Sequence, residues 1–366
     1  MNHKEQWIWL PDDKYKSEQT TVFSGFESDK AEIYTVAEFK RKYSFAQKII
    51  KADMRFSGDS AFQLYLNGSV VSTGPACVGG DFIGNERRRE NFYAFEATVY
   101  PEAEELDFFA RVKLVPVQIY EYSKGHGGFM LSAVLTFENG EQEEIITDES
   151  WFVRKNGAFT SASSYDGRIL PDEYVNAQVI ENIWNTETAP IPVRVENELI
   201  CDNSIISVFP FEKKTAVLTF DKIWAGFVKV VAKADGEISV LLKCRELNEE
   251  ARVENVIFCA DGEYRGFLMQ SAGNIEVEIE NKSGNVAELT VSFIETHYPV
   301  SDEASTVTGD AELNSVLETC KHTLRICRQT HHLDSPRHCE PMACTGDYYI
   351  ESLMTLFSFG DMRLAE

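Results

Sequence analysis

Apolar and polar residues alternate along much of the chain between about residues 30 and 300, and this period predicts β-strands. The segment 275–280 alternates apolar and acidic residues, as a strand with one solvated face requires. Two Asn-Gly pairs, Asn67-Gly68 and Asn139-Gly140, join apolar runs, and this arrangement is the strongest short signal for a β-hairpin. Many short strands separated by regular turns indicate β-sandwiches.

The β-rich region is too long for a single sandwich, so we expect two. A segment that contains Pro190 and Pro192 is the expected boundary between them. We therefore predict a chain that is mostly β with a C-terminal helical segment. An N-terminal β-sandwich would occupy residues 1–190, a second jelly-roll-like β-sandwich 191–300, and the helical segment 301–366.

The hydrophobic period changes after Pro299 and becomes helical. The apolar face of a first helix would be formed by Leu313, Val316, Leu317, Cys320, Leu324 and Cys327. Asp310 is expected to cap this helix at its N-terminus. A second helix is expected from about Asp347 to Phe359, ended by Gly360. Its inner face would be formed by Ile350, Leu353, Met354 and Phe357. Two helices cannot enclose a core, so the pair needs a sandwich face or further chain to cover it.

Charge and cysteine usage narrow the classes of partner. The formal net charge of −24 argues against nucleic acid and anionic membranes as partners, and a neutral ligand such as a sugar is compatible with it. No apolar run is long enough for a signal peptide or a membrane span. The eight cysteines form no dense framework, which favours reduced thiols and a cytoplasmic location.

The segment between the two expected helices holds the candidate chemistry. Three carboxylates, Asp334, Glu340 and Asp347, lie among Pro, Met, Ala and Cys side chains that solvate poorly. Desolvation and like-charged neighbours raise the pKa of a carboxyl group, and a raised pKa suits a general acid near neutral pH. The alternative is a polar connection in which Asp347 only caps a helix. Composition and spacing leave both interpretations open.

The run Asp334-x-Pro-x-x-x-Glu340, followed by Thr345-Gly346-Asp347, resembles the catalytic-domain signature of the bacterial α-L-rhamnosidases, glycoside hydrolase family 78. Weaker similarities to the family follow in order along nearly the whole chain. They are Leu64-Tyr-Leu-Asn67-Gly68 with Gly74-Pro75, Thr147-Asp-Glu-Ser-Trp151, Tyr165-Asp-Gly-Arg168, Trp224-Ala-Gly-Phe and Arg245-Glu246. The chain therefore resembles the N-terminal portion of a divergent member.

This resemblance implies two β-sandwiches followed by the first two helices of an (α/α)6 barrel, also called a six-hairpin barrel. It implies an inverting glycosidase, without a cofactor, that acts on a rhamnoside or the glycoside of a related deoxy sugar. Glu340 would be the general acid, and Asp334 and Asp347 would bind sugar hydroxyls and keep the proton on Glu340 by like-charge repulsion. The family places its catalytic base much further along the barrel, so we expect a truncated catalytic domain and no activity from this chain alone. The oligomeric state is left open.

Three positions of the signature differ from the family. His338 replaces a usual Arg, Pro341 replaces a frequent Arg, and Cys344 replaces a usual Trp. His338 and Cys344 are therefore candidates for substrate binding whose contacts with a sugar differ from those in the family. His338 lacks the planar guanidinium donors of Arg, and Cys344 lacks the large apolar surface of Trp. The identity of the sugar stays open for this reason.

The sequence also leaves three other interpretations open. A zinc site would draw on His331, His332, His338, Cys339 and Cys344, but their spacing is poor and no metal is predicted. Asp81, Glu86 and Glu90 form either a calcium site or part of a solvated charged loop, and the sequence favours the loop. A non-catalytic carbohydrate-binding protein would use exposed aromatic residues, although large aromatic residues in sandwiches ordinarily form the core. The candidates by residue type are Trp7, Trp9, Tyr65, Phe82, Tyr93, Trp151 and Trp184.

Overall fold

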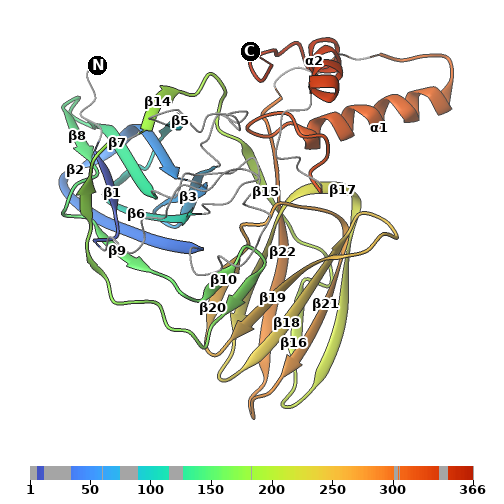
Figure 1. Ribbon diagram of the computed structural model, residues 1–366, viewed down its shortest axis with the longest axis horizontal. Helices are drawn as coiled ribbons and strands as arrows, with labels where there is room; N and C mark the ends of the chain where they lie inside the picture. The colour runs from blue at the N-terminus through green and yellow to red at the C-terminus, as the bar shows by residue number, and fades with distance from the viewer. Residues whose placement is uncertain are drawn as a thin grey trace. The chain divides into compact units, whose positions relative to one another are not determined.

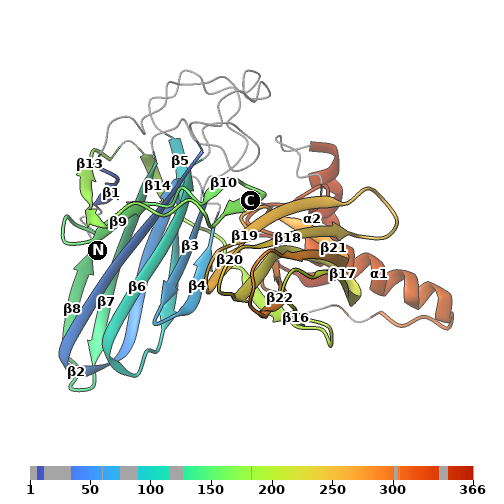
Figure 2. The same ribbon diagram turned by 90° about the horizontal axis from the view of Figure 1, so that it is seen from below.

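The structure is a computed structural model, and it describes residues 6–11, 34–59, 61–74, 90–114, 127–182, 184–300, 304, 306–337 and 345–365. These residues form two compact units (Figures 1 and 2). The first contains the described residues up to Gly157 together with Pro171–Val193, and the second contains Ala158–Leu170 and the described residues from Arg194 onward. The predicted fold class, mostly β with a C-terminal helical segment, is confirmed.

The first unit is built around one long strand, β2 (Thr35–Asp59). The N-terminal half of β2 pairs with β6 and β9, whereas its C-terminal half pairs with β7 and β5. The register shifts between the two halves, which is how a strand passes from one layer of a sandwich to the other. The other strands are β1 (Trp7–Trp9), β3 (Ala61–Leu66), β4 (Ser69–Thr73), β5 (Glu90–Val99), β6 (Ala103–Leu114), β7 (Gly128–Phe137), β8 (Gln142–Ile146), β9 (Phe152–Lys155), β12 (Val175–Asn176), β13 (Gln178–Ile180) and β14 (Trp184–Thr188).

Aromatic side chains fill the interior of this unit. The Phe39 and Phe129 rings lie 5.2 Å apart, and Trp151 packs at 5.9 Å from Phe108 and 5.8 Å from Phe129. All four side chains are fully buried. Aromatic pairs in this range add to the free energy that burial itself supplies, so they stabilise the contact between the layers.

The second unit has the strand order β10-β11-β19-β18-β21-β17-β22-β15, and its long strands run side by side in Figure 1. The longest, β17 (Lys213–Lys233), pairs with β21 in its first half and with β22 and β20 in its second half. The predicted alternation over 275–280 is confirmed, because Ile275, Val277 and Ile279 are buried. The remaining strands are β10 (Phe159–Ser161), β11 (Ser164–Asp166), β15 (Val195–Leu199), β16 (Ile205–Val208), β18 (Ile238–Arg245), β19 (Arg252–Phe258), β20 (Gly262–Arg265), β21 (Gln270–Asn281) and β22 (Ala287–His297).

Two helices complete the second unit, α1 (Ala311–Cys327) and α2 (Thr345–Phe359). The predicted cap is confirmed, because the Asp310 carboxylate accepts hydrogen bonds from the backbone N–H groups of Glu312 and Leu313. Gly360 ends α2 with a φ of +68°, as predicted. Only the C-terminal end of α1 is buried, where Ile326 and Cys327 pack on Ala225 of β17. None of the helices in the described ranges is long and apolar enough to cross a membrane.

The predicted inner face of α2 is wrong. Its expected residues, Ile350, Leu353, Met354 and Phe357, are all exposed, and Phe357 keeps 74% of its surface. The covered face instead carries Glu351, Thr355 and Phe359. The hydrophobic period of a helix identifies its apolar face but does not say which face is covered. Here the polar side of α2 packs on the rest of the unit, and the apolar side faces solvent.

Candidate functional site

The structure describes two of the five predicted site residues. Asp334 lies in the segment after α1 and is half-buried, and Asp347 lies in the first turn of α2 and is exposed. The predicted general acid Glu340 and the predicted substrate-binding residues His338 and Cys344 lie outside the described residues. The geometry therefore bears on the two flanking carboxylates and on what surrounds them.

A third carboxyl group, which the sequence interpretation missed, belongs to this site. Glu351 follows Asp347 by one helical turn, so the two side chains lie on the same face of α2. The Glu351 side chain is 14% exposed. Burial, and after it the charges of Asp347 and Asp334, raise the pKa of Glu351 to about 8. The like-charge repulsion predicted for Glu340 is therefore present at Glu351, and the four-residue spacing from Asp347 was the signal that could have revealed it.

The polar stripe of α2 faces a buried histidine. His332 Nδ1 lies 3.3 Å from Glu351 Oε2, and the His332 side chain is 2% exposed. Burial, followed by the charge of Arg328, lowers the pKa of His332 to about 4. The His332 and Tyr348 rings lie 6.1 Å apart, so the imidazole is enclosed by α2 and by the turn that follows α1.

That turn is held by a buried amide. Gln329 Nε2 donates hydrogen bonds to the backbone carbonyls of Thr296 at 2.7 Å and Ile326 at 3.0 Å, and its Oε1 accepts one from Arg194 at 3.1 Å. Gln329 is 1% exposed, so these bonds are shielded from water. They fix the chain direction just before His332 and Asp334.

Asp334 also lines a cavity of about 450 Å³ within the second unit. Its lining includes Thr319, His322 and Thr323 of α1, together with Ile223 and Glu246. A cavity of this size with an apolar floor and a few polar groups is typical of sites for small organic ligands. Asp334 therefore lines a sugar-sized space, and its charge also acts on Glu351.

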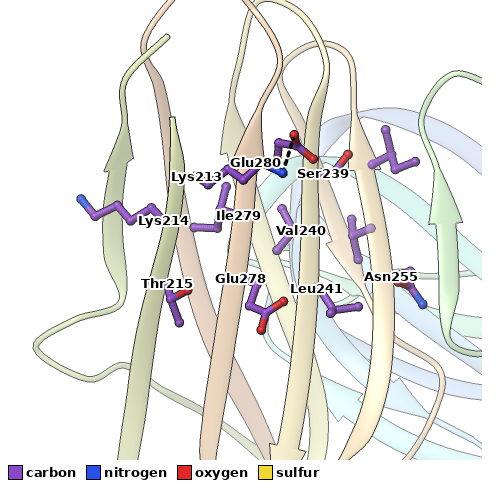
Figure 3. A pocket seen from close by; sticks show the side chains of 12 residues that line it. Lys213, Lys214, Thr215, Ser239, Val240, Leu241, Asn255, Glu278, Ile279 and Glu280 are labelled. Carbon is purple, nitrogen blue, oxygen red and sulfur yellow. Dashed lines mark ion pairs between the residues drawn. The ribbon is translucent and has the colours of Figure 1, made fainter. Parts of the chain in front are cut away.

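A second hollow lies on the outer face of the sheet in the same unit and has a similar volume of about 450 Å³ (Figure 3). Side chains of β17, β18, β19 and β21 line it, and none of the lining side chains is aromatic. Lys213 and Glu280 form an ion pair across its edge at 3.1 Å. Without an aromatic ring to stack on a sugar, this surface is a weaker candidate than the cavity at Asp334.

Most of the aromatic residues considered for sugar binding belong to the core. Trp7, Trp9, Trp151 and Trp184 are 0–3% exposed, and the Trp7 and Trp184 rings stack at 4.0 Å. They were candidates by residue type only, and their burial rules out an exposed sugar platform. Tyr65 and Tyr93 are half-buried, and Phe82 lies outside the described residues.

The metal interpretations gain no support. Within the described ranges, no group of three or more His, Cys, Asp or Glu side chains is placed to hold a metal ion. For the zinc alternative, only His331 and His332 are described, whereas His338, Cys339 and Cys344 are not. For the calcium alternative, Asp81 and Glu86 lie outside the described residues.

Comparison of the sequence with family models and with curated proteins finds no match. Solved structures of α-L-rhamnosidases share the fold. The enzyme from Dictyoglumus thermophilum is 16% identical with a TM-score of 0.59, over 97% of this chain and 42% of that one. The Streptomyces avermitilis enzyme, complexed with L-rhamnose, is 15% identical with a TM-score of 0.66, over 91% and 35%. The family 78 rhamnosidase of Bacillus sp. GL1 is 13% identical with a TM-score of 0.63, over 100% and 62%.

The fold of this chain is therefore that of a portion of the family 78 α-L-rhamnosidases, as the sequence resemblance predicted. The chain spans about a third to three fifths of the length of these three structures. Identities of 13–16% establish likeness of fold, and activity is argued separately below.

Proposed function

We propose that this chain is part of a glycoside hydrolase that acts on α-L-rhamnosides or on glycosides of a related deoxy sugar. The observation that carries this proposal is that Asp334, whose charge acts with that of Asp347 on the buried Glu351, lines a sugar-sized cavity in a fold shared with rhamnosidases. Carboxylates accept hydrogen bonds from sugar hydroxyls, and clustered carboxyl groups in a partly desolvated site can retain protons at neutral pH.

In the proposed mechanism Glu340 is the general acid that protonates the departing glycosidic oxygen. Asp334 and Asp347 accept hydrogen bonds from the hydroxyls of the sugar and hold its ring in place. An inverting enzyme needs a second carboxylate that activates water on the opposite face of the ring. We assign no residue of this chain to that role, and we expect these 366 residues alone to be inactive.

The two helices fit the start of an (α/α)6 barrel, which is part of this proposal. The outer side of α2 exposes Tyr349, Ile350, Leu353, Met354, Leu356 and Phe357. A contiguous apolar surface of this kind is typical of a site that another element covers. Further helices of such a barrel would cover it. The division at residues 190 and 300 and the cytoplasmic location stay predictions.

Calorimetry with L-rhamnose tests the binding half of the proposal. Saturable heat is expected from the wild-type protein, and Asp334→Asn is expected to lower the affinity by about tenfold or more, because the amide replaces a charged acceptor with a neutral one. Lys213→Ala is the matched control, since Lys213 lies at the outer hollow and not at the carboxylates. Equal affinity in the wild type and in Asp334→Asn would contradict the assignment.

An aryl α-L-rhamnoside tests the catalytic half. The expected result for this chain is no turnover above background. Robust turnover that Glu340→Gln abolishes would keep the acid assignment and would show that the base lies within these residues. Robust turnover that Glu340→Gln leaves intact would contradict the role given to Glu340.

A further inference from the structure

We propose that His322 determines which ligands the cavity at Asp334 accepts, because its Nδ1 atom is held in place to accept a hydrogen bond from a hydroxyl group of the ligand. The class of ligand that fits is an uncharged compound rich in hydroxyl groups. That this compound is a deoxy sugar rests on the proposed function. The orientation of the His322 ring does not, because it follows from the contacts of the ring itself.

An irregularity in β17 provides the partner of His322. β17 is in register with β21 up to Thr219 and again from Trp224, and residues 220–223 of β17 stand opposite the single residue Gly273 of β21. Such a bulge interrupts the regular ladder of hydrogen bonds and redirects the backbone of the strand. Ile223 belongs to this bulge and lines the cavity. Its backbone carbonyl accepts a hydrogen bond from a side chain of α1.

Two contacts fix the His322 ring. Its Nε2 atom lies 2.6 Å from the backbone carbonyl oxygen of Ile223. A carbonyl oxygen can only accept, so Nε2 must carry a ring hydrogen. The Trp224 ring is perpendicular to the imidazole at a centroid distance of 4.9 Å, and Trp224 Nε1 donates a hydrogen bond to Asp221 at 3.1 Å. The imidazole is therefore held in one orientation and, when neutral, in one tautomer.

The other ring nitrogen remains for a ligand. In a neutral imidazole with its hydrogen on Nε2, Nδ1 carries a lone pair and accepts hydrogen bonds. Among the described residues, His322 Nδ1 has no hydrogen-bond partner, and the atom keeps accessible surface. Because the His322 side chain lines the cavity, a hydroxyl group bound there can donate to Nδ1.

Neighbouring groups on α1 make the same demand on a ligand. The Thr319 hydroxyl donates to the backbone carbonyl of Ser315, and the Thr323 hydroxyl donates to that of Thr319, each at 3.0 Å. Both hydroxyl hydrogens are thereby used, so the two oxygens can only accept from a ligand. The carboxylates of the lining accept as well, and acceptors predominate. The lining residues that can donate by their type are Lys222, Ser315 and Ser335. A ligand must therefore bring its own donors, as a sugar does.

Nitrogen-15 NMR of the full chain with labelled histidine tests the ring and its contact with a ligand. The loss of one signal in His322→Gln assigns the resonances of His322. In mildly alkaline buffer we expect a neutral ring with its hydrogen on Nε2, and saturation with methyl α-L-rhamnoside should shift the Nδ1 resonance much more than that of Nε2. The shift is measured on the wild-type chain, so it does not depend on how stably a variant folds. A hydrogen on Nδ1, or an Nδ1 resonance that saturation leaves in place, would overturn the proposal.

Calorimetry with methyl α-L-rhamnoside and its monofluorinated deoxy analogues tests the hydroxyl contact. His322→Gln keeps an amide that can donate to the Ile223 carbonyl but lacks Nδ1, so it should weaken binding of the parent rhamnoside by about fivefold. Fluorine is small and cannot donate. The analogue that lacks the contacting hydroxyl should therefore bind the wild type about fivefold more weakly, and His322→Gln should not weaken it further.

Glu312→Gln is the matched control, since Glu312 is an exposed residue in the first turn of α1. It should bind the parent rhamnoside as the wild type does. An equal effect of His322→Gln on the parent and on every analogue would mean that His322 acts only through the structure, and this would overturn the proposal.

The failure of this inference can be told apart from the failure of the proposed function. Rhamnoside binding that Asp334→Asn weakens and His322→Gln leaves unchanged would overturn the role of His322 alone. Absence of any rhamnoside binding by the wild-type chain would overturn the proposed function and, with it, the contact between His322 and a sugar.

Discussion

The Arg337 guanidinium donates a hydrogen bond to Glu249 Oε1 at 3.2 Å and a second one to the backbone carbonyl of Glu250. Glu249 in turn accepts hydrogen bonds from the backbone N–H groups of Glu246 and Leu247. The segment that carries Asp334 is thereby joined to the loop after β18, and Glu246 of that loop lines the same cavity as Asp334. Arg337 therefore connects two segments that both contribute residues to the lining of this cavity.

Replacement of Arg337 should affect ligand binding more than stability. Arg337 and Glu249 are 25% and 32% exposed, so loss of the pair should change the free energy of unfolding by about 1 kcal/mol or less. Arg337→Ala should lower the affinity for L-rhamnose, because misplacing a binding group by about 1 Å is enough to weaken a site. Arg337→Lys should retain only part of the wild-type affinity for L-rhamnose, since a single ammonium group cannot reproduce both hydrogen bonds of the guanidinium. Urea unfolding and calorimetry measure the two quantities.

The control for this comparison is Lys213→Ala, which removes an exposed ion pair with Glu280 at the outer hollow. Both variants should unfold at nearly the same urea concentration, and only Arg337→Ala should bind rhamnose more weakly. If the two variants bind equally well, the link between Arg337 and the site is wrong.

The reversed orientation of α2 gives a prediction with an internal control. Phe359 is 5% exposed and lies 5.1 Å from the Arg328 guanidinium, so Phe359→Ala should lower the free energy of unfolding by about 3–5 kcal/mol. Phe357 is two residues away and 74% exposed, so Phe357→Ala should change it by about 0.5 kcal/mol or less. Similar losses from the two variants in urea unfolding would show that the apolar face of α2 is covered in solution.

Local chemistry was predicted well from the sequence, and long-range placement was not. Asn67 and Gly68 have positive φ values of 50° and 79°, as their turn requires, and Asp310 caps its helix through its own side chain. Such features depend on a few neighbouring residues. By contrast, β2 and β17 each change partners halfway along their length, and alternation is the same in both halves. Only tertiary contacts decide such pairing.

The candidate site shows the same contrast between local features, which were predicted, and long-range placement, which was not. The acidic segment stood out because carboxylates in apolar surroundings are unusual, and Asp334 does lie at a cavity. Glu351 was missed because an acidic residue within a helix ordinarily faces solvent. Its burial depends on the orientation of α2, which was predicted with the opposite face inward. An error in one helix orientation therefore concealed a site residue.

Gly226 offers a test of the close contact between β17 and β22 in the second unit. A Cβ atom added at Gly226 would lie 1.9 Å from the backbone carbonyl oxygen of Ile294, where β17 meets β22. Gly226→Ala should therefore force the strands apart and cost about 3 kcal/mol or more, or prevent folding. Gly284→Ala, with no atom within 4 Å of the added Cβ, should leave the unfolding transition nearly unchanged. Thermal unfolding of the two variants measures this difference. A Gly226→Ala variant that unfolds at the wild-type temperature would contradict the close approach of β17 and β22.

The buried carboxyl group of Glu254 predicts how stability changes with pH. Glu254 is 0% exposed and accepts hydrogen bonds from the Tyr264 hydroxyl and from Gln270 Nε2 at 2.8 Å. Burial raises the pKa of Glu254 to about 7, although both hydrogen bonds act in the opposite direction. Between the unfolded pKa near 4.5 and this value, the native state holds a proton that the unfolded state has released.

The stability associated with this proton is therefore complete below about pH 4.5 and is lost as the pH rises through about 7. The full loss is about 3 kcal/mol, because the pKa of Glu254 rises from 4.5 in the unfolded state to about 7 in the folded state. Glu254→Gln cannot titrate, so the difference in unfolding free energy between the two proteins should shift by most of this amount in favour of the variant between about pH 5 and about pH 8. Other titrating groups, Glu351 among them, are common to both proteins and cancel. Urea unfolding across this range measures the difference, and a difference that stays constant with pH would mean that Glu254 is already ionised in the folded protein.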